Sequence, residues 1–315
     1  MTRIGNSDLD VFPLSLGGNV FGWTADEQAS FAVLDSYAAA GGNFIDTADG
    51  YSAWVPGHSG GESEGVIGRW VAARGNRDDV IVATKVSSHP EYKGLRAANI
   101  KAAAEASLRR LGTDRIDLYY THFDDPEVPV EEIITALDAL VGEGKVRQIA
   151  ASNITPERLA ESLEFSDREG LAKYVALQQH YNLVERDGYE GALREVVQAH
   201  GLSSVPYFGL AKGFLTGKYR PGGEAVDSPR AAGAGEYLKG EQAERGVRVL
   251  AALDEVAAAH DAEPATVALA WLAAQPTVAA PIASARNVGQ LGALVAVADL
   301  KLTAEELAKL TAASG

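Results

Sequence analysis

Short apolar runs alternate with longer amphipathic stretches along nearly the whole chain. Eight apolar runs predict β-strands, at residues 13–17, 43–46, 80–84, 116–121, 147–151, 174–178, 203–208 and 278–283. Between them, apolar positions recur at helical spacing, at residues 26–40, 61–73, 95–111, 129–142, 156–168, 188–200, 242–260 and 264–275. Because parallel strands need a long crossover connection, this repeated alternation of strand and helix predicts a parallel sheet.

The number of repeated units selects among α/β folds. Eight units in a chain of 315 residues fit a closed (β/α)8 TIM barrel better than an open sheet, whose edge strands would need a cover. We therefore expect a single domain spanning residues 1–315. A polar turn at Asn6-Ser7-Asp8 between two extended runs predicts an N-terminal β-hairpin within residues 2–12. Residues 51–60 and 218–240 are expected to form long loops, which in a compact barrel are usually functional or disordered.

Ionisable side chains follow three neighbouring strands of the expected barrel. Asp46, Lys85 and His122 stand at strand ends, and Tyr51 follows five residues after Asp46. In a (β/α)8 barrel the active site is built from loops that leave these carboxyl ends. Taken singly, each residue has a structural explanation, such as a helix cap or an ion-pair partner. Together they indicate a proton-transfer site, because an ammonium beside a phenol lowers the phenol pKa and a carboxylate holds the ammonium in place.

Several longer motifs, in order and spacing, resemble the aldo-keto reductases, (β/α)8 oxidoreductases that use a nicotinamide cofactor. The resemblance extends from the expected hairpin to about Leu310. Its most specific segments are Gly42-Asn-Phe-Ile-Asp46-Thr-Ala-Asp-Gly-Tyr51, Gly61-Glu-Ser-Glu-Gly-Val-Ile-Gly68, Ala83-Thr-Lys85, Asp117-Leu-Tyr-Tyr-Thr-His122, Gly144-Lys-Val-Arg-Gln-Ile-Ala-Ala-Ser152-Asn153, Leu177-Gln178-Gln-His-Tyr-Asn182-Leu, Tyr207-Phe-Gly-Leu-Ala-Lys-Gly213-Phe-Leu-Thr-Gly-Lys218 and Pro281-Ile-Ala-Ser-Ala-Arg286.

The resemblance implies a role for each of the four ionisable residues. Tyr51 is similar to the general acid that protonates the carbonyl oxygen during reduction. Lys85 would lower the pKa of Tyr51, Asp46 would pair with Lys85, and His122 would orient the carbonyl.

The resemblance also implies the residues that hold the nicotinamide. Ser152, Asn153 and Gln178 are similar to those that bind the carboxamide, which suits side chains that both donate and accept hydrogen bonds. Tyr207 is similar to the aromatic residue that stacks on the nicotinamide ring.

Further positions correspond to the phosphate-binding part of the family. Leu210, Lys212 and Gly213 lie where the family wraps the pyrophosphate. Residues 284–290, including Ser284 and Gln290, open a helix after the eighth strand, and a helix N-terminus is a natural anion site. Arg286 is the candidate ligand of an adenosine 2'-phosphate, because a guanidinium matches phosphate oxygens in pairs. The expected cofactor is therefore NADP (NADPH) rather than NAD. The alternative is that Arg286 is a solvated cation at the end of a helix and binds no phosphate.

The chain also departs from the family pattern. Ser284 stands where the family commonly has Gly, Leu294 where an Asn meets the adenine, and Phe208-Gly209 where Ser-Pro usually follows the stacking tyrosine. The loop after Tyr51 is longer than in many members, so Trp54 is expected either to overhang the substrate or to pack on the surface.

Composition limits the possible partners and compartments. The formal net charge of −15, from 28 Lys plus Arg against 43 Asp plus Glu, disfavours a nucleic-acid partner. A phosphate-bearing cofactor must then be held by local exceptions such as Lys212, Arg286 and backbone amides. The chain has no cysteine, which excludes disulfides and thiolate metal sites, and it has no His-Glu-x-x-His motif, so no metal is expected. Without a secretory or membrane-spanning pattern, we expect a cytoplasmic protein with no membrane partner.

The expected function is that of an NADP(H)-dependent oxidoreductase that reduces the carbonyl of an aldehyde, ketone or sugar to an alcohol. Two alternatives are a cofactor-sensing regulatory subunit of the same fold and a non-redox (β/α)8 lyase or isomerase. The partner is a small-molecule carbonyl substrate; sugars, small aldehydes and quinones all remain candidates, and the sequence does not indicate an oligomeric state.

Overall fold

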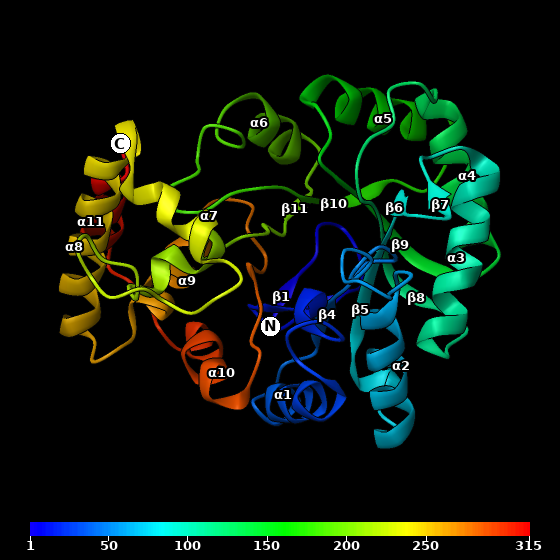
Figure 1. Ribbon diagram of the computed structural model, residues 1–315. Coiled ribbons are helices and arrows are strands. Elements are labelled where there is room, and N and C mark those ends of the chain that lie inside the picture. Colours follow the sequence, from blue (N-terminus) through cyan, green and yellow to red (C-terminus); the bar gives the residue numbers. More distant parts are fainter.

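The central sheet contains eight parallel strands. A computed structural model describes all residues, 1–315, and Figure 1 shows helices arranged around the strands. The strand order is β11-β10-β9-β8-β5-β4-β3-β12. These strands are β3 (Ser15–Gly17), β4 (Phe44–Asp46), β5 (Ile81–Val86), β8 (Ile116–Thr121), β9 (Val146–Ser152), β10 (Tyr174–Gln178), β11 (Ser203–Ser204) and β12 (Ile282–Ala283).

Backbone hydrogen bonds close this sheet into a barrel. The Ser204 N–H donates to Thr277 O at 2.8 Å, and the Ala279 N–H donates to Ser204 O at 2.9 Å. The strands after β10 are shorter than predicted, because Pro206 and Pro281 lack the N–H that a ladder requires. The predicted (β/α)8 fold is therefore confirmed, with its closing seam built from two-residue strands.

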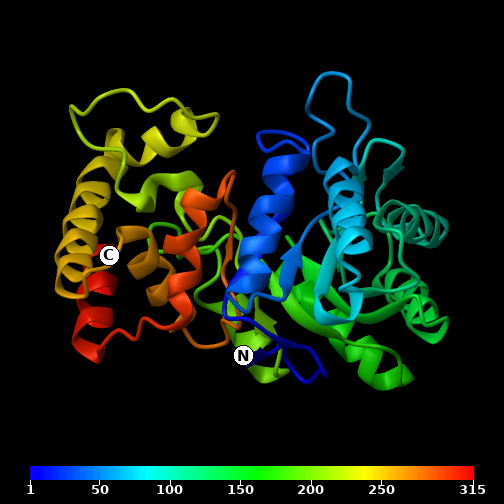
Figure 2. The same ribbon diagram turned by 90° about the horizontal axis from the view of Figure 1, so that it is seen from below.

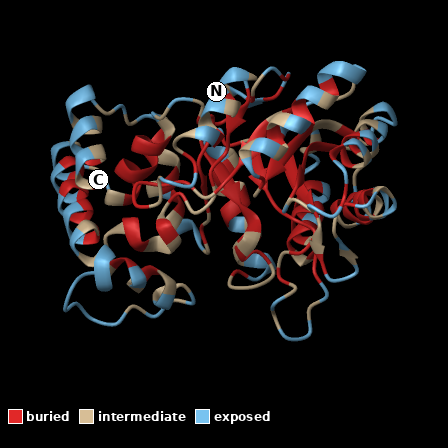
Figure 3. Ribbon diagram, turned by 90° about the horizontal axis from the view of Figure 1, so that it is seen from above, coloured by how far each residue is buried: buried red, intermediate tan, exposed pale blue.

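Helices cover the outside of the barrel, and Figure 3 shows their buried sides facing the strands. The α-helices are α1 (Glu27–Ala39), α2 (Glu62–Arg74), α3 (Ala97–Leu111), α4 (Val130–Gly142), α5 (Pro156–Glu169), α6 (Ala192–Ala199), α7 (Ala231–Gly235), α8 (Ala243–Ala259), α9 (Pro264–Ala273), α10 (Val288–Val295) and α11 (Ala304–Ala313). Short 3-10 helices are η1 (Gly18–Val20), η2 (Arg77–Asp79), η3 (Ala211–Thr216), η4 (Glu236–Leu238), η5 (Gly240–Gln242) and η6 (Ala296–Ala298). None of the helices is long and apolar enough to cross a membrane.

Local sequence explains where several helices begin and end. The Thr155 hydroxyl accepts from the Arg158 N–H at the start of α5, Pro156 occupies its first turn, and Gly170 ends it with a φ of 68°. That backbone conformation is left-handed, which glycine adopts without the steric cost of a side chain. These positions fix the length of α5 and hence the span between β9 and β10.

Two regions differ from the predicted pattern. Residues 218–240, expected to be a loop, contain α7 and η4 in their second half. A small hairpin of β6 (Ser88–His89) and β7 (Tyr92–Lys93) follows β5, where only a connection to the next helix was expected. Both insertions lie after the carboxyl ends of strands, where barrel enzymes carry their functional loops.

The predicted N-terminal hairpin is present, and it closes one end of the barrel. It consists of β1 (Thr2–Arg3) and β2 (Asp10–Val11), and Ile4, Leu9 and Val11 are at most 1% exposed. These side chains pack with interior residues of the strands in one apolar cluster. In Figure 2 the hairpin (dark blue) lies at the lower end and residues 218–240 (yellow-green) at the upper end. Only the carboxyl end of the barrel is therefore left open to ligands.

Candidate active site

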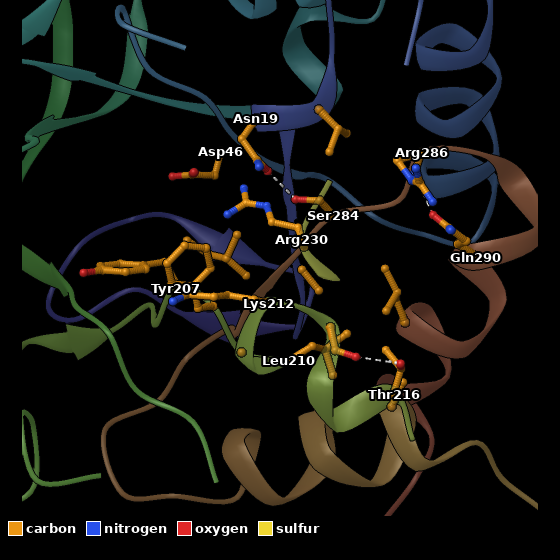
Figure 4. A pocket seen from close by; sticks show the side chains of 18 of the residues that line it. Asn19, Asp46, Tyr207, Leu210, Lys212, Thr216, Arg230, Ser284, Arg286 and Gln290 are labelled. Atoms are coloured by element: carbon orange, nitrogen blue, oxygen red, sulfur yellow. Dashed lines mark hydrogen bonds between the residues drawn. The ribbon is translucent and has the colours of Figure 1, made fainter. Parts of the chain in front are cut away.

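A cavity of about 800 Å³ opens at the carboxyl ends of the strands. Figure 4 shows side chains converging on it from several elements, including Asp46 on β4 and Lys212 on η3. The lining includes every site residue predicted from the sequence except Lys85: Asp46, Tyr51, Trp54, His122, Ser152, Asn153, Gln178, Tyr207, Leu210, Lys212, Gly213, Ser284, Arg286 and Gln290.

Lys85 lies directly behind the cavity wall. Its side chain is fully buried on β5, and Nζ lies 2.7 Å from Asp46 Oδ2, 2.7 Å from Thr47 O and 3.1 Å from Tyr51 Oη. Three acceptors match the three N–H groups of an ammonium. The other Asp46 oxygen accepts from Gln178 Nε2 at 2.9 Å. Burial lowers the pKa of Lys85, and the Asp46 carboxylate opposes that shift. The geometry therefore places the Lys85 amino group in contact with both Asp46 and Tyr51.

The pKa of Tyr51 is raised well above its ordinary value. Burial is the largest cause, and the Asp46 carboxylate adds to it, since Tyr51 Oη lies 3.4 Å from Asp46 Oδ2. This direction is opposite to the one expected from Lys85 alone, because burial and Asp46 outweigh the ammonium. The phenol therefore keeps its proton at neutral pH.

His122 lines the cavity beside Tyr51, with ring centroids 6.0 Å apart. Burial, with a further contribution from the Lys85 ammonium, holds the pKa of His122 well below its usual range. The imidazole is therefore neutral at pH 7. Its Nδ1 lies 2.9 Å from Ser88 Oγ, while Nε2 has no partner within the protein.

An amide and two hydroxyl groups meet at the ends of β9 and β11. Asn153 Nδ2 donates to His122 O at 2.8 Å and to Ser152 Oγ at 3.0 Å, and Asn153 Oδ1 accepts from Tyr207 Oη at 2.8 Å. The Tyr207 ring stacks on His180 at a centroid distance of 5.5 Å and an interplanar angle of 12°. These contacts fix the Tyr207 ring as a rigid wall of the cavity.

The rest of the cavity is rich in cations without acidic partners. Lys212, Lys218, Arg230 and Arg286 line it, and none has a carboxylate within 4.0 Å. The only lining carboxylates are Asp46, which is paired with Lys85, and Glu263. In a chain with a net charge of −15, this is a local positive field suited to an anion.

The backbone around two of these cations is ordered by local contacts. Lys212 and Gly213 have φ values of 58° and 94° in the turn of η3. Gln290 Oε1 accepts from the Arg286 N–H at 2.9 Å, which ties Arg286 to the first turn of α10. Ser284 Oγ donates to Asn19 Oδ1 at 2.5 Å and packs on Gly17, where a Cβ would lie 2.5 Å from that oxygen.

Aromatic side chains and Arg230 form the rim near Tyr51. Trp54 is 51% exposed and meets Trp23 and Tyr51 edge-on, with centroids 5.4 and 6.2 Å away. The Arg230 guanidinium lies 5.8 Å from the Trp23 ring centroid and 5.2 Å from that of Phe208. Sequence reasoning missed Arg230 and Asn19 as lining residues, because no local pattern shows that residues 218–240 fold back toward Tyr51 or that Asn19 meets Ser284.

No group of three or more histidine and carboxylate side chains is arranged to hold a metal ion.

Comparison with known proteins gives consistent matches over nearly the whole chain. A family model described as "Aldo/keto reductase family" matches residues 13–314. The chain is 33% identical to Protein tas of Escherichia coli over 342 aligned positions, which cover 98% of this chain and 96% of that protein. It is 33% identical to norsolorinic acid reductase stcV of Emericella nidulans (94% and 76% covered) and to the uncharacterized oxidoreductase YrpG of Bacillus subtilis (98% and 94%).

Proposed function

Because the chain belongs to the aldo/keto reductase family, we propose that it reduces a small-molecule carbonyl to an alcohol with NADPH as the reductant. Family membership and the oxidoreductase relatives support carbonyl reduction as the reaction. The observation that carries the proposal is the contact of the Tyr51 phenol with a fully buried Lys85 that is itself paired with Asp46.

The cavity fits a nicotinamide dinucleotide in size and chemistry. Its volume of about 800 Å³ is large enough for a dinucleotide and a small substrate. Ser152, Asn153 and Gln178 would bind the carboxamide, and Tyr207 would stack on the nicotinamide ring. When bound, the cofactor supplies a hydride to the carbonyl carbon.

The cations suit the phosphate groups of this cofactor. Lys212, together with the backbone of Leu210 and Gly213, would hold the pyrophosphate. Arg286 would bind the 2'-phosphate with Ser284 and Gln290 beside it, since its guanidinium has no carboxylate partner. A free guanidinium at this position supports NADPH over NADH, because NADH has no group to neutralise it.

Proton delivery is the task of the residues around Tyr51. The phenol keeps its proton at neutral pH, so Tyr51 can donate it to the carbonyl oxygen as negative charge develops there. The Lys85 ammonium then stabilises the phenolate through its 3.1 Å contact, and Asp46 keeps Lys85 in position. A neutral His122 would donate a hydrogen bond from Nε2 to the same carbonyl oxygen.

The aromatic rim favours a planar, apolar carbonyl compound over a sugar. Trp54 and Phe123 are 51% and 50% exposed beside Tyr51 and His122, and Phe123 stacks on His122 at 4.7 Å. Exposed aromatic rings at a cavity mouth bind flat apolar groups. One relative is named norsolorinic acid reductase stcV.

Equilibrium titration with NADPH and NADH tests the proposal, with fluorescence or calorimetry as the readout. We expect NADPH to bind more tightly than NADH and to be oxidised when an aromatic aldehyde is added. Failure to bind either nucleotide would contradict an oxidoreductase and leave a lyase or isomerase. Tight NADPH binding with no oxidation by any carbonyl would indicate a cofactor-sensing subunit.

A further inference from the structure

A chain of polar contacts runs from the partly buried His122 away from the cavity to the buried Asp49. His122 Nδ1 lies 2.9 Å from Ser88 Oγ, and Ser88 Oγ lies 3.5 Å from Asp49 Oδ1. Neither Ser88 nor Asp49 lines the cavity, and neither has a part in the proposed proton delivery. These contacts join three segments, after β4, after β5 and after β8, into one line of donors and acceptors that ends at the imidazole.

The backbone is shaped to place Ser88 between the other two residues. Ser87 has a φ of 112°, an uncommon conformation for a residue with a side chain, and it directs the chain from β5 into the β6–β7 hairpin. Gly50 lies against Ser88, since a Cβ at Gly50 would be 2.6 Å from Ser88 Oγ. The backbone conformation of Ser87 and the absence of a side chain at Gly50 therefore both help to place the Ser88 hydroxyl group.

Asp49 is an unusual end for such a chain. It is fully buried, and its Oδ2 has no hydrogen-bond partner. Charged and titratable groups from each neighbouring element face it: Glu64 from α2, Arg110 from α3, Lys85 from β5, Tyr119 from β8 and, beside Gly60, His89 from β6.

The balance of these groups keeps a proton on Asp49. Burial and the Glu64 carboxylate raise the pKa of Asp49 to about 8, while Arg110, the Gly50 N–H and Ser88 oppose the rise. Glu64 itself is held by Arg110 Nε and Thr84 Oγ1, both at 2.5 Å, so Arg110 is already engaged by another carboxylate. Near neutral pH, Asp49 is therefore a carboxylic acid and a hydrogen-bond donor.

We propose that Asp49, acting through Ser88, sets the tautomer of His122 and thereby decides whether His122 can donate a hydrogen bond to the substrate carbonyl. This inference rests on the proposed function of the same site. A protonated Asp49 donates to Ser88 Oγ, so the Ser88 hydroxyl donates to His122 Nδ1. The neutral imidazole then carries its proton on Nε2, which has no hydrogen-bond partner in the protein and is free to donate.

Ionisation of Asp49 reverses every hydrogen bond in the chain. The Ser88 hydroxyl then donates to the carboxylate, and His122 Nδ1–H donates to Ser88 Oγ. In proton terms, Asp49 passes its proton to Ser88, Ser88 passes one to His122 Nδ1, and the Nε2 proton leaves to solvent. The negative charge ends on Asp49, and the bare Nε2 lone pair repels a carbonyl oxygen. Asp49 and Ser88 are thus positioning residues for His122.

NMR of the full-length protein with ¹⁵N-labelled histidine tests this directly, because the two tautomers have distinct ring ¹⁵N shifts. The His122 signals are assigned with His122→Gln. In wild-type protein we expect the Nε2–H tautomer at pH 6.5 and the Nδ1–H tautomer at pH 9.5. Asp49→Asn, whose amide offers an N–H to Ser88 at every pH, should keep Nε2–H at both. Asp78→Asn, at an exposed carboxylate, is the matched control and should switch like wild type.

The contradicting results are equally definite. The same His122 tautomer at both pH values in wild type, or an unchanged switch in Asp49→Asn, would overturn the proposal. Ser88→Ala breaks the chain at its centre and should remove the switch while leaving Asp49 in place. Because the spectra need neither cofactor nor substrate, they report the coupling of Asp49, Ser88 and His122 even if the protein reduces no carbonyl.

Turnover gives a second readout. Wild-type carbonyl reduction should fall by about a hundredfold above the pH at which Asp49 ionises, which is the size of effect expected when one donor to a developing oxyanion is lost. Asp49→Asn should abolish this fall. An identical pH profile in Asp49→Asn and wild type would contradict the proposed coupling.

Discussion

Arg286 is the residue on which the choice between NADPH and NADH depends. It lines the cavity at the start of α10, its guanidinium has no acidic partner, and its own N–H is fixed by Gln290. An unpaired guanidinium that is partly withdrawn from water binds a phosphate better than a hydroxyl, because two parallel N–H···O contacts become possible.

Replacing Arg286 with alanine should therefore weaken NADPH binding selectively. Charge-assisted hydrogen bonds contribute about 1.5–3 kcal/mol, so the Kd for NADPH should rise by about 10- to 100-fold while the Kd for NADH changes little. Arg168→Ala, at an exposed position on α5, is the matched control. Equal weakening of both nucleotides by Arg286→Ala would place Arg286 elsewhere than on the 2'-phosphate.

The raised pKa of Asp49 also leads to a prediction about the pH dependence of stability. Its pKa of about 8 in the folded protein is well above the ordinary value for an aspartate. Between pH 4 and pH 8 the folded state thus holds a proton that the unfolded state has lost, and its contribution to stability declines as pH rises, by up to about 1.4 kcal/mol per pH unit.

The comparison of wild type with Asp49→Asn isolates that contribution. In urea denaturation at pH 5, 6.5 and 8, the variant should gain stability relative to wild type with each rise in pH. A difference in unfolding free energy that stays constant across this range would show that Asp49 is ionised in the folded protein.

At the scale of elements, the sequence identified most of the barrel but not its insertions. Apolar runs located all eight strands, because a strand buried on both faces is apolar at successive positions. The β6–β7 hairpin and the course of residues 218–240 were not predicted, since both are positioned by contacts with distant parts of the chain and not by a local pattern. The Asp49–Ser88 contact, between residues 39 positions apart, has no local signature either.

Helix α11 was missed for a different reason, because its signal was present in the sequence. Thr303 and Glu306 form a capping box, in which Thr303 Oγ1 accepts from the Glu306 N–H at 3.3 Å and Glu306 Oε2 accepts from the Thr303 N–H at 2.7 Å. The spacing Thr-x-x-Glu before an amphipathic stretch is a recognised helix start.

This cap gives a prediction for α11. Thr303→Ala should lower the unfolding free energy by about 1 kcal/mol, the usual cost of losing an N-cap hydroxyl. Neither Thr303 nor Glu306 lines the cavity, so NADPH affinity should not change. Calorimetry and nucleotide titration of the same sample check both parts, and a loss of NADPH affinity would contradict the expectation that this cap affects stability alone.

At the scale of the whole molecule, the two ends of the barrel have different tasks. The N-terminal hairpin seals one end with apolar side chains, while the other end carries polar and cationic groups. We propose that residues 1–315 form one unit, because the hairpin packs into the interior of the strands and the Gly5 N–H donates to Ser203 Oγ at 2.8 Å. A seal of this kind contributes stability without touching the chemistry.

Leu9→Ala tests this division. Removing a side chain that is 1% exposed should destabilise the protein by about 2–5 kcal/mol and keep a single unfolding transition. Val247→Ala, at a 44% exposed position, should have little effect. Two separate transitions in wild type or in Leu9→Ala would show that the hairpin or another part unfolds on its own.

The central claim is that a protonated Tyr51, held by Lys85 and Asp46, completes carbonyl reduction by NADPH. The most direct measurement is single-turnover oxidation of bound NADPH by an aromatic aldehyde, in wild type, Tyr51→Phe and the control Tyr92→Phe. We predict that Tyr51→Phe binds NADPH as wild type does and oxidises it about 10²- to 10⁴-fold more slowly, while Tyr92→Phe is unaffected. Oxidation by Tyr51→Phe at the wild-type rate would contradict the claim.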